Sequence, residues 1–136
     1  MITNAELLKF MLDEYGKSST LATFRYAREI NETKKYLETL DGTKEVNYDA
    51  LEKIISVFLS SLRTWDSSKK PSASLSILPL LINKILISGT RYSSHYVTFT
   101  LKEIKDIFEG NLNGLFNKSG SDPRILLDRL PLKMLR

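Results

Sequence analysis

Residues 75–88 constrain the fold more than any other part of this sequence, because apolar side chains fall on almost every side of a helix built from them. A helix that is apolar all round is typical of the centre of a bundle, and the alternative is an apolar surface that awaits a partner. Pro79 suits a first helical turn, and Gly89 suits the position just past the end. The stretch is too short and too polar to span a bilayer. We therefore expect a central helix near residues 79–88.

Two amphipathic helices are expected at the start of the chain. The first begins at a capping box formed by Thr3 and Glu6 and stops at Gly16. The second runs from about residue 19 or 20 to about residue 40 and ends at an Asp–Gly turn. Apolar positions recur at helical spacing in both. The stripe of the first helix is Leu8, Met11, Leu12 and Tyr15, and that of the second is Ala22, Tyr26, Ile30, Thr33, Leu37 and Leu40.

A third helix, from Asn47 or Asp49 to about Trp65, shows the clearest amphipathic pattern of the chain. Its polar face carries Lys53, Ser56, Ser60 and Arg63, and its apolar stripe consists of Leu51, Ile54, Ile55, Phe58, Leu62 and Trp65. We expect Ile54, Phe58 and Leu62 to be buried against the central helix. The polar residues 66–74 that follow read as a loop.

The second half of the chain is less regular. Residues 92–100 alternate like a strand, but nothing obvious pairs with them, and we expect an extended connection. Thr100 and Glu103 repeat the capping-box pattern before a helical stripe that crosses Gly110, so residues 101–116 form either one helix or two. Asp122 and Pro123 open a last helix that ends near residue 130. The sequence thus predicts an all-α fold, one domain over residues 1–136 with a compact bundle of five or six helices.

Composition excludes several kinds of chemistry. The chain has no cysteine and only one histidine, His95, which leaves no thiolate nucleophile, no disulfide and no histidine-based metal cluster. His95 lies in an extended stretch where its neighbour Ser94 points the other way, and no nucleophile elbow or phosphate-binding glycine loop occurs. We expect no catalytic residue, no cofactor and no metal. No signal peptide is visible, which favours an intracellular protein: cytoplasmic, or nuclear in a host cell if the chain is viral.

Binding needs only a surface, and the first hypothesis is therefore a protein-interaction, regulatory or adaptor module that joins a larger assembly or self-associates. Large apolar side chains that lie off the main stripes of their helices are what interfaces use. The candidates for this protein-binding surface are Phe10, Phe24, Ile107 and Phe116.

Nucleic-acid binding is the alternative hypothesis. The formal charge is −2 over residues 1–60 and +6 over residues 61–136, and such an asymmetry can mark a polyanion surface. Glu29 and Glu32 are interleaved with the basic residues of the second helix, and intrahelical salt bridges explain both. Tyr36 lies beside that basic face, where it could stack a base. The nucleic-acid candidates are Arg25, Arg28, Lys35, Tyr36, Lys69, Lys70, Arg124, Arg129, Lys133 and Arg136.

Overall fold

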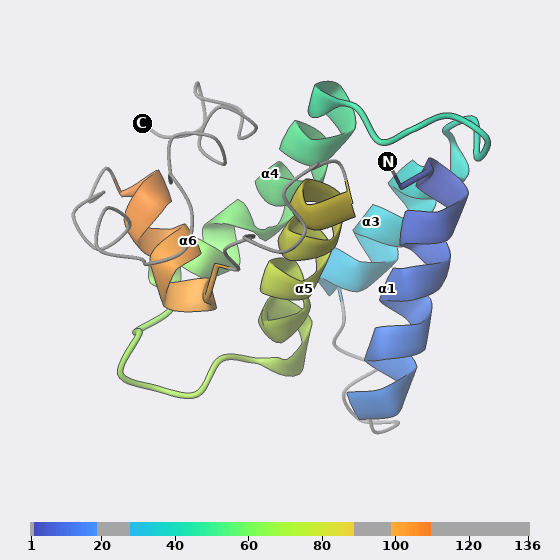
Figure 1. Cartoon of the computed structure of the whole chain (residues 1–136). Coiled ribbons are helices and arrows are strands. Elements are labelled where there is room, and N and C mark those ends of the chain that lie inside the picture. Colours follow the sequence, from blue (N-terminus) through green and yellow to red (C-terminus); the bar gives the residue numbers. More distant parts are fainter. Residues whose placement is uncertain (1, 19–27, 89–98, 110–136) are drawn as a thin grey trace.

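The computed structural model describes residues 2–18, 28–88 and 99–109 (Figure 1). Within these ranges the chain is all-α, and the one β pairing is an isolated antiparallel bridge between Thr3 and Glu45. The prediction of an all-α bundle is confirmed. The helices are α1 (Asn4–Ser18), α3 (Arg28–Glu38), α4 (Tyr48–Thr64), α5 (Ala73–Ser88) and α6 (Leu101–Phe108).

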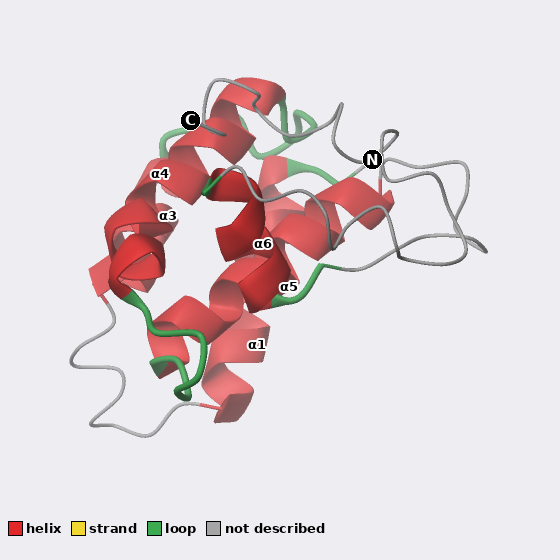
Figure 2. Ribbon diagram, turned by 90° about the vertical axis from the view of Figure 1, so that its left-hand side faces the viewer, coloured by secondary structure: helices red, strands yellow, loops and turns green. Residues whose placement is uncertain are grey.

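Helix α5 lies at the centre of the bundle, as its composition predicts. It contacts α1, α3, α4 and α6, and Figure 1 shows it between α1 and α6. The view from the side in Figure 2 shows the helices gathered around a shared interior. Six apolar side chains of α5 are buried: Leu75, Ile77, Leu78, Leu81, Ile82 and Ile85.

The prediction that α5 begins near Pro79 is wrong. The helix begins at Ala73, and Pro79 lies inside it. The hydroxyl of Ser72 accepts a hydrogen bond from the backbone N–H of Leu75 at 3.1 Å, which is the role of an N-cap. Because this cap stands in a polar run, the proline was the more visible helix signal. An internal proline removes one backbone hydrogen bond, and the dense packing around α5 offsets that loss.

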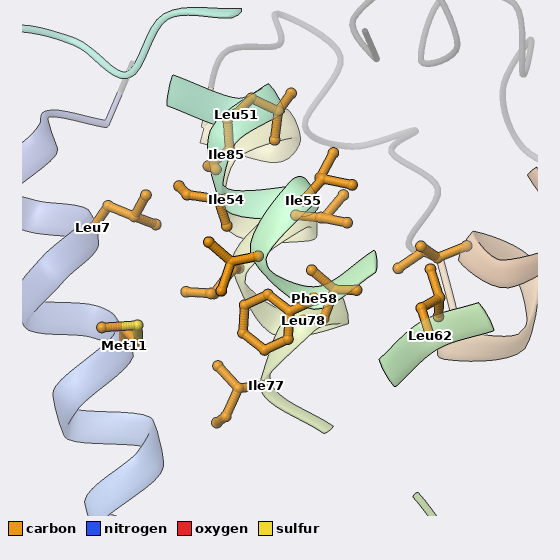
Figure 3. Close-up of a cluster of buried hydrophobic side chains, with 14 of the residues drawn as sticks. Leu7, Met11, Leu51, Ile54, Ile55, Phe58, Leu62, Ile77, Leu78 and Ile85 are labelled. Carbon is orange, nitrogen blue, oxygen red and sulfur yellow. The ribbon is translucent and has the colours of Figure 1, made fainter. Parts of the chain in front are cut away.

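Helix α4 supplies the side chains that meet α5. Ile54, Phe58 and Leu62 are fully buried, and Figure 3 shows Phe58 beside Leu78 of α5. The expected burial of these three residues is confirmed, and α4 packs against the central helix. Asn47 caps α4, where its side-chain oxygen accepts a hydrogen bond from Ala50 N–H at 2.8 Å.

Helix α1 buries Met11 and Tyr15 of the predicted stripe, but Leu7 takes the place of Leu8 and Leu12 in the core. Leu7, Met11 and Tyr15 are buried, whereas Leu8 is half-buried and Leu12 is exposed. Apolar residues at helical spacing form two overlapping stripes on α1, one that begins at Leu7 and one that begins at Leu8. Helix α5 covers the stripe that begins at Leu7 (Figure 3). The helix also continues past its glycine at position 16 to Ser18. A glycine inside a helix costs only about 1 kcal/mol.

The start of α1 is tied to the turn after α3. The capping box is present, with hydrogen bonds in both directions between Thr3 and Glu6 at 3.1 Å. The backbone N–H of Val46 donates to Ile2 O at 3.0 Å, and that of Asn4 donates to Lys44 O at 2.8 Å. The predicted turn at residues 41–42 is formed, and a Cβ on its glycine would lie 3.0 Å from that of Ala5.

Helix α3 buries Ile30, Thr33 and Leu37, as its stripe predicts. The predicted start of this helix and its first two apolar positions lie outside the described residues. So do most of the 92–100 segment, the question of one or two helices across residue 110, and the predicted helix from residue 122.

Helix α6 begins at the predicted capping box. Glu103 N–H donates to Thr100 Oγ1 at 3.2 Å, and Thr100 N–H donates to Glu103 Oε1 at 2.9 Å. Just before it, the side-chain amide of Asn83 forms two hydrogen bonds of 2.8 Å with the backbone N–H and carbonyl of Phe99. This pair joins the entry of α6 to the central helix.

Candidate interaction surfaces

Two of the predicted protein-binding residues lie in the described ranges, and their environments differ. Phe10 is half-buried on α1, and the Lys84 ammonium of α5 lies 5.2 Å from its ring centroid. That distance suits a cation–π interaction.

Lys84 also lies near the start of α1. Hydrogen bonds from Thr3 hold the pKa of Glu6 below its usual range, and the charge of Lys84 adds to this effect.

Ile107 is fully buried, so the expectation that it lies off the core stripe of its helix is wrong. It follows Ile104 by three residues, and the two lie side by side on the helix surface. The neighbouring helices cover a stripe wide enough to include Leu101 and Phe108 as well. Phe24 and Phe116, the other two candidates, lie outside the described residues.

The described ranges expose two large hydrophobic side chains, Leu12 on α1 and Leu80 on α5. Their exposed fractions are 39% and 41%. Leu80 precedes Lys84 by one helical turn, which places it on the side of α5 that meets Phe10. We call Phe10, Leu80 and Lys84 the α1–α5 edge.

The basic face of α3 is matched by carboxylates. Arg28 pairs with Glu32 at 2.9 Å and with Glu29 at 3.3 Å, while Lys35 is exposed. Tyr36 is half-buried against the core. This burial raises the pKa of its hydroxyl, and the negative charge of the nearby Asp49 adds to the effect. Arg25 lies outside the described residues. The face therefore presents less positive charge than its sequence implies.

The remaining basic candidates divide into two groups. Lys69 and Lys70 are exposed in the loop between α4 and α5. The C-terminal candidates lie outside the described residues; they are Arg124, Arg129, Lys133 and Arg136. The described ranges hold thirteen Lys or Arg and fourteen Asp or Glu, a formal charge of −1, against +4 for the whole chain. The positive excess of the chain thus belongs to residues outside these helices.

A buried carboxylate joins three helices, and the sequence interpretation missed it. Glu29 of α3 is 8% exposed and accepts hydrogen bonds from Ser61 Oγ of α4 at 2.6 Å and Ser74 Oγ of α5 at 2.9 Å. Burial alone would raise the pKa of Glu29. The hydrogen bonds, from Ser61 above all, and the charge of Arg28 outweigh burial and lower this pKa overall. Intrahelical pairing, the predicted role, accounts for Glu32 but for only part of the environment of Glu29.

A signal for this role was present in the spacing. Glu29 precedes Thr33 by four residues and Leu37 by eight, so it continues the buried stripe of α3 by one turn. A carboxylate on a core stripe needs hydroxyl or amide donors from neighbouring helices. The identity of those donors depends on the tertiary structure.

A half-buried lysine joins α6 to α4. The Lys105 ammonium donates to Leu62 O at 3.1 Å and to Arg63 O at 3.0 Å, and it pairs with Glu109 at 2.7 Å. The carbonyls belong to the last turn of α4, where a helix attracts positive charge. Lys105 of α6 thus supplies hydrogen-bond donors to the carbonyls at the C-terminal end of α4.

Of the polar side chains buried in the described ranges, Glu29 and Ser74 form hydrogen bonds that hold helices together. No group of three His, Asp or Glu residues within these ranges could hold a metal ion. None of the described helices combines the length and hydropathy needed to cross a membrane. His95 lies outside the described residues. Comparisons of the chain with protein-family models, with curated proteins and with solved structures find no match.

Proposed function

We propose that this chain is a non-catalytic protein-interaction module that docks its partner at the α1–α5 edge. The observation that carries the proposal is the exposure of Leu80 beside Lys84 and the half-buried Phe10 ring, at the seam of two adjacent helices. An exposed aliphatic side chain one helical turn from a lysine that lies over an aromatic ring offers an apolar centre and a polar rim for a small interface.

The non-catalytic part of the proposal is supported by how the described polar residues are used. Glu29, Asn83 and Lys105 each bind groups of a neighbouring helix or of the chain entering one. A side chain fixed in this way is poorly placed to exchange protons with a substrate, because a general base must be free to reach the proton it removes.

Self-association gives the most direct test. Mass measured by light scattering after size exclusion, over a wide concentration range, should show an oligomer that Leu80→Glu disrupts. Leu12→Glu is the matched control, because Leu12 has nearly the same exposure and lies off the α1–α5 edge. A charge placed at a desolvated apolar centre weakens an interface strongly, whereas a charge outside it has little effect.

Two results would count against the proposal. A wild-type chain that stays monomeric at every concentration shows that the edge does not bind a second copy. Equal losses in Leu80→Glu and Leu12→Glu show that association, where it occurs, is not centred on this edge.

A further inference from the structure

The loop that joins α4 to α5 is fixed by its own hydrogen bonds. The Trp65 indole N–H donates to Lys69 O at 3.0 Å, and Lys69 N–H donates to Asp66 O at 2.9 Å. The Asp66 carboxylate accepts from the backbone and the hydroxyl of Ser68 at 2.9 and 2.8 Å. We call residues 65–70 the Trp65–Lys70 loop. The Trp65 indole and the backbone at Lys69 are thus held in place before any ligand arrives, which lowers the entropy cost of binding.

Within the described ranges neither Lys69 nor Lys70 forms an ion pair, and both are exposed. Exposed Lys35 and Lys53 of the described helices likewise form no ion pair there, but Lys69 and Lys70 differ from them in lying beside the Trp65 indole. Five other basic residues of these helices pair with a carboxylate four positions later: Lys9 with Asp13, Arg28 with Glu32, Lys34 with Glu38, Lys102 with Asp106, and Lys105 with Glu109. The loop lysines therefore keep their charge available to an external anion.

The loop's own carboxylate offsets only part of that charge. Hydrogen bonds from Ser68 hold the pKa of Asp66 below its usual range, and the charge of Lys105 acts in the same direction. Asp66 is therefore ionised at neutral pH, and one negative charge stands against the two lysines of the loop. Arg63, in the last turn of α4, is exposed and adds a further cation at this end of the helix.

We propose that the Trp65–Lys70 loop is a binding site for single-stranded nucleic acid. Lys69 and Lys70 bind consecutive phosphates, and the half-buried Trp65 ring provides a surface on which a base stacks. Lysine suits phosphate as a point charge that needs no bidentate geometry. The indole favours a nucleic acid over an acidic protein segment, because unpaired bases carry π-faces that stack on aromatic rings. This site is separate from the α1–α5 edge and does not depend on it.

The chain offers a built-in readout, because Trp65 is its single tryptophan. Titration with a labelled twelve-residue oligothymidylate should change Trp65 fluorescence and raise the anisotropy of the label with the same midpoint. With two or three phosphates neutralised on a single strand, the association constant should fall about tenfold between 50 and 200 mM salt.

Charge reversal locates the site. Lys69→Glu/Lys70→Glu should weaken binding at least tenfold, measured by anisotropy. The control Lys44→Glu/Lys53→Glu changes the net charge by the same amount at two exposed positions outside the loop, and it should weaken binding less than threefold. Circular dichroism of both variants checks that the helices are retained.

Three results would overturn the proposal. The first is an oligonucleotide that changes neither signal at low salt. The second is an equal loss in both double variants, which is the behaviour of net charge without a site. The third is an oligoglutamate of the same charge that competes as well as the oligonucleotide, which would assign the loop to an acidic protein partner.

Discussion

Two charged side chains join helices of this bundle, one of them buried and the other half-buried, and they do so in different ways. Glu29 accepts hydrogen bonds from side-chain hydroxyls on two other helices, so its environment depends on Ser61 and Ser74. Lys105 donates to main-chain carbonyls at the end of α4, and its side chain is 14% exposed. A charge held by side chains can lose its partners to single substitutions, whereas one held by the backbone cannot. The carboxylate junction is therefore the more vulnerable of the two.

The largest effect is expected for Glu29→Ala. It removes two charge-assisted hydrogen bonds and leaves the buried hydroxyl of Ser74 without its acceptor. We expect the free energy of unfolding to fall by about 3 kcal/mol, measured by denaturant titration. The control Glu32→Ala, on the exposed side of α3, should change stability little. Equal losses in the two variants would show that the buried junction has no special importance.

A smaller loss is expected for Lys105→Met. Methionine keeps the length of the apolar stem but cannot donate to the carbonyls of Leu62 and Arg63. Those carbonyls lie near the helix end and regain water, so we expect a loss of about 1–2 kcal/mol. Lys102→Met, on the exposed side of α6, is the control. A loss in Lys105→Met larger than that in Glu29→Ala would reverse the proposed order of the two junctions.

Thr33→Val tests the opposite case, a buried hydroxyl that lacks a hydrogen-bond partner in the described structure. Thr33 lies one turn from Glu29 and is fully buried, and its hydroxyl has no hydrogen-bond partner in the described structure. Replacing it with a methyl group should raise the free energy of unfolding by about 1 kcal/mol. Thr39→Val is the control, because that hydroxyl donates to Tyr36 O at 2.6 Å, and its loss should not stabilise the chain.

The smallest effect is expected in the pH dependence of stability. The pKa of Glu29 is lower in the folded state than its ordinary value of 4.5. Its contribution is therefore complete above the pKa of the unfolded chain and is lost as the pH falls through the folded-state pKa. The stability difference between wild type and Glu29→Gln should shrink between pH 5 and pH 3. Parallel stability curves would contradict this assignment.

Most of the described fold could be predicted because its helices carry local signals. Asn47 caps α4, and capping boxes at Thr3 and Thr100 begin α1 and α6. Such caps can be recognised in the sequence because the residues that form them lie within three or four positions of one another. The start of α5 was missed because its cap, Ser72, resembles the polar loop around it.

The candidate surfaces could be predicted less well, because exposure depends on which neighbours cover a side chain. Ile107 is apolar whether it faces the core or a partner, and only the packing of α6 decides between them. Glu29 lies on a core stripe, but its serine donors are 32 and 45 residues away in the chain. The backbone at Lys69 is likewise fixed by the indole of Trp65, and no spacing rule predicts that contact.

The pairing of residues 2–5 with residues 41–46 has a consequence for how the chain folds during synthesis. The backbone partners of Asn4 and Val46 lie about forty residues apart in sequence, so α1 emerges from the ribosome well before its N-terminal end can be fixed. Until then its buried face, Leu7, Met11 and Tyr15, has neither α5 nor the turn to cover it. Helix α1 is thus secured only after residues well beyond it have been made, and a nascent chain stalled before residue 46 should expose that face to chaperones.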